Sequence, residues 1–159
     1  MAARKIKVAV GCDPNAVALK ESIKDFLTSE GIEFEDFGSD DAIYANVAFA
    51  VGEAVAAGRF DRGILVCGTG IGMSIAANKV PGVYAALLTD PYSAERAVKS
   101  NHANVATLGA QTIGPNVATA LVKIWLDAEW EPGSRSEAKV RRIAEYADAH
   151  ERSGAPKCE

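Results

Sequence analysis

Three short apolar runs, at residues 6–10, 63–66 and 83–88, constrain the fold more than any other feature of this sequence. Each run is nearly continuous rather than alternating, which is typical of strands in a parallel sheet whose two faces are both covered by helices. Segments of helical period separate the runs, as in successive βαβ units. We therefore predict a three-layer α/β/α, Rossmann-like, doubly wound sheet of about five parallel strands. The strands are expected near residues 6–12, 33–37, 62–67, 83–88 and 105–109.

The segments between the strands predict helices. The first is the best defined, because Leu19, Ile23, Phe26 and Leu27 share one face and Gly31 follows as the closing residue. The others are expected near residues 43–57, 71–79, 92–100, 115–128 and 136–149. A Glu-Pro-Gly-Ser break at residues 131–134 precedes the last helix, which we expect to pack on its own domain or on a second subunit. The 159 residues suit one domain, placed at 1–150, followed by a loose tail at 151–159.

Composition excludes several classes of partner. A net charge of −4 without a basic cluster argues against nucleic acid or an anionic membrane as the partner. No stretch approaches the roughly 20 apolar residues of a membrane span, and no signal-peptide core follows the first residues, so we expect a cytoplasmic protein. The cysteines Cys12, Cys67 and Cys158 are odd in number and lack paired spacing, which indicates neither a disulfide scaffold nor a zinc site.

The loop at residues 67–72, Cys-Gly-Thr-Gly-Ile-Gly, has the most specific composition in the chain. It follows a predicted strand at the sheet edge where α/β proteins bind ligands. Gly68, Gly70 and Gly72 allow backbone N–H groups to converge on an anion, and the helix that follows adds the positive end of its dipole. Their G-x-G-x-G spacing differs from the dinucleotide fingerprint, and no Walker sequence occurs, so a nucleotide ligand is disfavoured.

Several motifs together resemble the type B ribose-5-phosphate isomerases and their relatives, the galactose-6-phosphate isomerases. The similarity includes Val-Gly-Cys-Asp at 10–13, Tyr44 in a Tyr-x-x-Val-Ala setting, and the whole stretch 63–79. It continues through Asp-Pro-Tyr-Ser-Ala at 90–94 and Asn-Val-Ala-Thr-Leu-Gly-Ala at 104–110. The resemblance spans residues 5–147 and implies that 1–150 form a single sugar-phosphate isomerase domain.

The resemblance implies interconversion of an aldose phosphate and a ketose phosphate, most simply ribose 5-phosphate and ribulose 5-phosphate, without metal or organic cofactor. It also implies a homodimer with sites shared between the subunits. Cys67 would be the base, the loop amides would hold the enediolate, and Thr69 would move protons between the substrate oxygens. Tyr44 would bind substrate. A glutamate used in one branch of the family would fall at Met73, which cannot take a proton.

Asp13 has two interpretations. It either caps the helix that follows Pro14 or binds a sugar hydroxyl, and we include it among the candidate catalytic residues. Cys12, at the end of a predicted buried strand, is expected to be structural.

The sequence departs from the family at several polar positions. The family's Cys-Asp-His-Ala-Gly reads Cys-Asp-Pro-Asn-Ala at 12–16, and the ring-opening histidine is replaced by Ser100. His102, two places further on, is a weak catalytic candidate. A phosphate-binding arginine is replaced by Gln111. The remaining candidates for substrate binding are Ser100, Asn101, Arg135 and Lys139.

These losses leave two alternatives to ribose 5-phosphate isomerisation. One is a different sugar phosphate such as a tetrose 4-phosphate (erythrose or erythrulose), which cannot close a furanose ring because O4 carries the phosphate. Such a substrate needs no ring-opening histidine. The other is a non-catalytic sugar-phosphate-binding protein that kept the fold.

Overall fold

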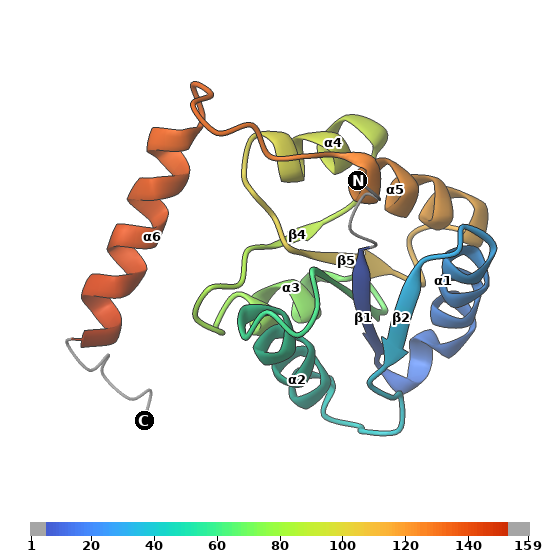
Figure 1. Ribbon diagram of the computed structural model, residues 1–159. Helices are drawn as coiled ribbons and strands as arrows, with labels where there is room; N and C mark the ends of the chain where they lie inside the picture. The colour runs from blue at the N-terminus through green and yellow to red at the C-terminus, as the bar shows by residue number, and fades with distance from the viewer. Residues whose placement is uncertain (1–5, 153–159) are drawn as a thin grey trace.

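The structure, a computed structural model, describes residues 6–152 and contains one five-stranded parallel sheet (Figure 1). The strand order is β2-β1-β3-β5-β4. The strands are β1 (Lys7–Cys12), β2 (Glu33–Asp36), β3 (Arg62–Cys67), β4 (Ala85–Leu87) and β5 (Val105–Gly109). The central strands β1, β3 and β5 are almost wholly buried, which is why their sequences are apolar along their length. The predicted doubly wound α/β fold is confirmed.

Helices cover both faces of this sheet (Figure 1). They are α1 (Val17–Ser29), α2 (Tyr44–Ala56), α3 (Ile71–Ala77), α4 (Pro91–Lys99), α5 (Pro115–Asp127) and α6 (Glu137–Arg152), with a 3-10 turn η1 (Pro14–Ala16) before α1. The side chains of α1, α4 and α5 form one core with the sheet, and those of α2 and α3 form the other. Gly31 takes a left-handed φ of 68° just after α1, as the sequence predicted.

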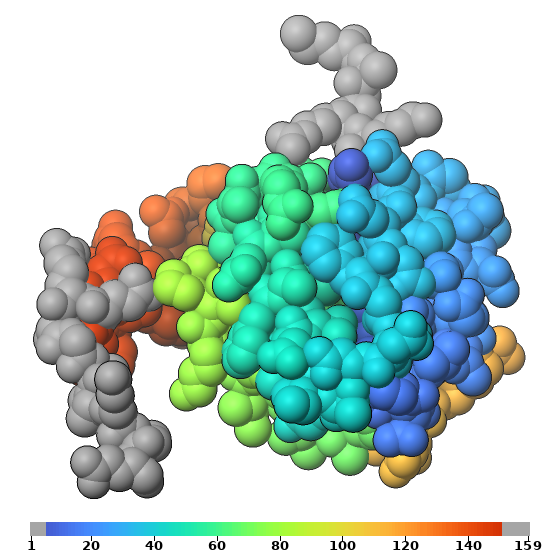
Figure 2. Space-filling view, turned by 90° about the horizontal axis from the view of Figure 1, so that it is seen from below, coloured from blue at the N-terminus to red at the C-terminus, as the bar shows by residue number. Residues whose placement is uncertain are grey.

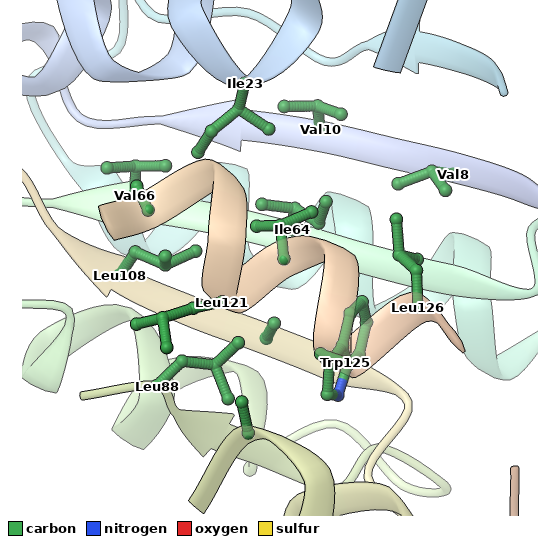
Figure 3. Close-up of a cluster of buried hydrophobic side chains, with 14 of the residues drawn as sticks. Val8, Val10, Ile23, Ile64, Val66, Leu88, Leu108, Leu121, Trp125 and Leu126 are labelled. Atoms are coloured by element: carbon green, nitrogen blue, oxygen red, sulfur yellow. The ribbon is translucent and has the colours of Figure 1, made fainter. Parts of the chain in front are cut away.

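The core beneath α1 and α5 fixes the three central strands relative to one another. Figure 3 shows Ile23 of α1 and Leu121 and Trp125 of α5 packed over strand residues such as Ile64 and Val66. All five side chains are at most 1% exposed. Close packing of this kind leaves little freedom for the strands to shift, so the loops at their carboxyl ends start from fixed positions.

The last helix, α6, stands at one side of the layered body in both views (Figure 1 and Figure 2). Its residues belong to neither core. Ile143 and Tyr146 are 52% and 56% exposed, although Val140 is buried. Within the described residues, no helix has the length and apolar character needed to cross a lipid bilayer. The predicted tail at 151–159 lies almost entirely outside the described residues.

Candidate active site

A cavity of about 220 Å³ lies at the carboxyl ends of β1, β3 and β5. This is the edge at which open α/β sheets bind ligands. The residues that line the cavity are Asp13, Asn15, Tyr44, Cys67, Gly68, Thr69, Gly72 and Gln111. Six of these eight were predicted site residues, drawn from three separate segments of the chain.

Cys67 is the last residue of β3 and is 6% exposed. Its Sγ accepts a hydrogen bond from the N–H of Gly70 at 3.1 Å. An N–H group directed at sulfur stabilises the negative charge of a thiolate. The sulfur therefore lies at the cavity and accepts a backbone hydrogen bond there.

Gly70 makes this contact possible and does not itself line the cavity. Its φ of 77° is left-handed, and it is the N-cap residue that precedes α3. A side chain here would place Cβ 2.9 Å from the carbonyl carbon of Leu108. Only glycine fits both the φ and the space, so the loop can turn back onto the sulfur.

The other backbone N–H groups of the loop do not donate to Cys67 Sγ. Within the described residues, the N–H groups of Gly68, Thr69 and Gly72 have no hydrogen-bond partner, whereas that of Ile71 donates to Thr69 Oγ1 at 3.3 Å. All three residues with free amides line the cavity. Preorganised donors beside a base are suited to an oxygen that becomes negatively charged during reaction.

Tyr44, at the start of α2, packs directly on this loop. A Cβ at Gly72 would come within 2.6 Å of Tyr44 Cζ, so the glycine leaves the space that the ring occupies. Tyr44 is 37% exposed. The phenol therefore forms one wall of the cavity and remains accessible from solvent.

Asp13 caps η1, as one of its two interpretations predicted, and its binding of a sugar hydroxyl stays a prediction. Its Oδ1 accepts the N–H of Asn15 at 2.8 Å and caps η1, while its own N–H donates to Val66 O at 2.9 Å. Its Oδ2 makes no hydrogen bond within residues 6–152. The carboxylate thus caps the turn with one oxygen and leaves the other for a ligand.

Ser100, Asn101 and His102 lie elsewhere in the chain. They precede the amino end of β5, whereas Cys67 is at the carboxyl end of β3, so the length of the sheet separates the two groups. His102 has a left-handed φ of 55° and stacks on Trp130 with ring centroids 4.8 Å apart. Burial, with a smaller effect from Arg62, lowers the pKa of His102.

The predicted cationic contacts also lie away from the cavity. Arg135 and Lys139 are in the segment that leads into α6 and in its first turn. Within the described part of the chain, no lysine, arginine or histidine lines the cavity. A phosphate bound there would need its positive partners from outside this lining.

Two lining residues, Asn15 and Gln111, were not among the predicted site residues. Both follow the carboxyl end of a strand, which is where open α/β sheets bind ligands. The Gln111 N–H donates to Gly68 O at 2.9 Å, and a Cβ at Gly68 would lie 3.5 Å from the Gln111 side-chain amide. Gln111 therefore contacts the loop that carries Cys67.

The other residues considered from the sequence lie in the cores. Met73 is fully buried between α3 and the sheet, so it does not reach the cavity. Cys12 packs in the core on the opposite face from Cys67, and burial raises the pKa of its thiol to about 11. Cys12 is thus a neutral thiol near pH 7. Cys158 lies outside the described residues.

Comparison with known proteins places this arrangement in a family. Residues 8–143 match the model of the Ribose/Galactose Isomerase family. The ribose-5-P isomerase B of Listeria innocua is 47% identical over 143 residues, covering 88% of this chain and 96% of that protein. The D-erythrulose-4-phosphate isomerase of Pectobacterium atrosepticum is 46% identical over 145 residues, covering 89% and 95%.

A solved structure agrees with the sequence comparison. The ribose-5-phosphate isomerase B of Clostridium thermocellum superposes with a TM-score of 0.86 at 41% identity, covering 91% of this chain and 99% of that one. The match spans the sheet, the cavity and the loop at 67–72. The chain therefore belongs to the ribose/galactose isomerase family.

Proposed function

We propose that this protein is an aldose–ketose isomerase that acts on a sugar phosphate, most simply interconverting ribose 5-phosphate and ribulose 5-phosphate. The observation that carries the proposal is the placement of Cys67 Sγ beside three free backbone amides in one cavity. An isomerase of this kind needs a base at C2 and donors for the enediolate, and this loop provides both. The relatives named above act on such substrates.

In the proposed mechanism the Cys67 thiolate removes the proton from C2 of the open-chain aldose. The electron pair of the C–H bond forms the C1–C2 double bond, and the negative charge moves to O1 of the enediolate. The amides of Gly68, Thr69 and Gly72 stabilise that oxygen. The Thr69 hydroxyl transfers a proton between O2 and O1, and the Cys67 thiol returns its proton to C1 to give the ketose.

Asp13 and Tyr44 would orient the sugar. The free Oδ2 of Asp13 accepts a hydrogen bond from a sugar hydroxyl, and the Tyr44 phenol lies against the loop opposite it. Correct placement of C2 beside the sulfur strongly increases the rate of isomerisation, because proton transfer requires the two atoms to lie within hydrogen-bond distance.

We further propose that the active unit is a homodimer. The cavity lacks a basic lining in one subunit, and α6 presents Ile143 and Tyr146 outside both cores. A second copy that covers α6 would bury this apolar surface and bring its Arg135 and Lys139 to the phosphate. Ser100 and Asn101 of the second copy are then also candidates for contact with the sugar. A reducing cytoplasm, which would keep Cys67 a thiol, remains our expected location.

A tetrose 4-phosphate is the second candidate substrate. It is favoured by the absence of an imidazole from the described lining of the cavity, because ribose 5-phosphate must be opened from its furanose form first. A relative with this specificity, the erythrulose-4-phosphate isomerase, is 46% identical to this chain.

The two substrates are separated by measuring kcat/KM for ribose 5-phosphate and for erythrulose 4-phosphate with the same enzyme preparation. We expect turnover of at least one of them without added metal or cofactor. A higher kcat/KM for ribose 5-phosphate supports the pentose as substrate, and the reverse supports the tetrose. Binding of both without turnover of either would contradict the proposal and indicate a non-catalytic sugar-phosphate-binding protein.

A further inference from the structure

We propose that Lys20 and Asp36 are positioning residues for this active site: their ion pair holds the segment that carries Asp13 against the end of β2. The inference rests on the proposed function, because it assigns these residues a part in the same cavity. Neither residue lines the cavity, so both would act through others.

Lys20 is an unusual residue for an α1 helix that otherwise buries leucine and isoleucine. It is 2% exposed, and its Nζ lies 2.8 Å from Asp36 Oδ1. Burying an ammonium group is costly unless a partner compensates for the lost water. Replacement of a buried ion pair by apolar residues is often neutral for stability, so stability alone does not account for this pair.

Backbone hydrogen bonds connect the Asp36 carboxylate to the end of β1. Asp36 Oδ1 also accepts the N–H of Gly38 at 2.9 Å, and Gly38 O accepts the N–H of Cys12 at 3.2 Å. Phe37 N donates to Val10 O at 2.7 Å alongside. The next residue after Cys12 is Asp13, whose carboxylate lines the cavity.

The ammonium group constrains the same segment from its other side. Lys20 lies in the first turn of α1, directly after η1, which Asp13 caps. The pair therefore fixes both ends of the short segment from Cys12 to the start of α1. Asp13 and Asn15 belong to this segment and line the cavity, so their positions depend on the ion pair.

Lys24 provides a matched control on the same carboxylate. Its Nζ lies 2.8 Å from Asp36 Oδ2 and 2.9 Å from Glu21 Oε1, and it is 22% exposed. Removing Lys24 deletes a charge of the same sign at nearly the same place. It leaves the connection from Lys20 through Oδ1 to Gly38 in place.

The test compares Lys20→Met/Asp36→Leu, an apolar replacement of the whole pair, with Lys24→Met. Each protein is assayed for kcat and KM with its sugar phosphate and for amide hydrogen exchange at Gly38, Cys12 and Leu121. We expect the double variant to keep its fold and the exchange rate of Leu121 in α5. Its kcat/KM should fall about tenfold or more, and exchange at Gly38 and Cys12 should rise about tenfold. Lys24→Met should stay within about twofold of wild type in all of these.

Three outcomes would overturn the inference. The first is a double variant that matches Lys24→Met in kcat/KM, whether or not exchange rises. The second is a fall in kcat/KM without faster exchange at Gly38 and Cys12. The third outcome concerns Asp36→Asn, which keeps the shape of the side chain and is used if the double variant does not fold. The inference is overturned if this variant changes neither kcat/KM nor amide exchange at Gly38 and Cys12.

The proposed function fails by a separate result, since wild-type protein would turn over no sugar phosphate. In that event the exchange rates still decide whether the pair holds the Cys12–Asp13 segment.

Discussion

Cys67 and Gly70 form the smallest unit of the site. The sulfur accepts a hydrogen bond from the N–H of a glycine whose left-handed φ most other residues adopt only with strain. The chemistry proposed for Cys67 thus depends on a residue that has no side chain and does not line the cavity.

This dependence predicts the effect of Gly70→Ala. A Cβ would meet the Leu108 carbonyl carbon at 2.9 Å, so the loop must shift and carry its N–H away from Sγ. We expect a loss of about 1–3 kcal/mol in the free energy of unfolding and at least a tenfold lower kcat/KM. Gly114→Ala is the control, because its Cβ would meet nothing within 4 Å and its φ is −82°. Equal behaviour of the two variants in urea unfolding and kinetics would contradict this account.

Asp36 predicts a pH dependence of stability. Burial by itself would raise its pKa, but hydrogen bonds from Lys20, Lys24 and the Gly38 amide together lower the pKa to about 2, from 3.8. A lowered pKa in the folded state contributes stability that is present above the unfolded value and is lost as the pH falls through the folded one.

The measurement is urea unfolding of wild type and Asp36→Asn between pH 7 and pH 2. The difference in unfolding free energy should be constant above about pH 5 and should shrink between about pH 4 and pH 2. A difference that is the same at every pH would show that the charge of Asp36 contributes nothing to stability.

At the scale of elements, α6 is the part of the chain whose role one subunit does not explain. It carries an apolar stripe that includes Ile143 and Tyr146, yet both side chains are more than half exposed. An amphipathic helix normally buries its apolar stripe against another element. A second copy of the chain is the occupant that the proposed dimer assigns to it.

Ile143→Asp should therefore weaken the dimer, because it places a charge in the apolar stripe. We expect sedimentation equilibrium to show a dimer for wild type and at least a tenfold larger dissociation constant for the variant. Glu145→Gln, at a residue whose side chain is 58% exposed and faces Arg141, should leave the constant within about twofold. A wild-type protein that sediments as a monomer would contradict the dimer proposal.

For the whole molecule, the sequence predicted the layers and the loop better than the surroundings of the site. The apolar runs at 6–10 and 63–66 form buried central strands, as predicted, whereas the run at 83–88 contains the half-buried edge strand β4. Glycine spacing marked the loop after β3. Strand bounds were predicted to within two residues at every strand, since turn residues flank each run.

These local patterns could not predict which residues from distant parts of the chain lie close together. The motif positions of Ser100 and His102 did not reveal that they lie at the amino end of β5, away from Cys67 in the same subunit. The burial of Lys20 could not be predicted from the helical pattern alone, because its partner Asp36 is on a different element. Asn15 and Gln111 were not chosen as site residues because they replace family residues, although they line the cavity themselves.

The proposed mechanism requires Cys67 to transfer the proton between C2 and C1, and isomerisation in deuterium oxide tests this transfer. Proton NMR would follow solvent deuterium entering the substrate with wild type, Cys67→Ala and Cys12→Ala. The account predicts exchange and turnover with wild type and Cys12→Ala, and a fall of about 10²- to 10⁴-fold with Cys67→Ala. Exchange at the wild-type rate in Cys67→Ala would contradict it.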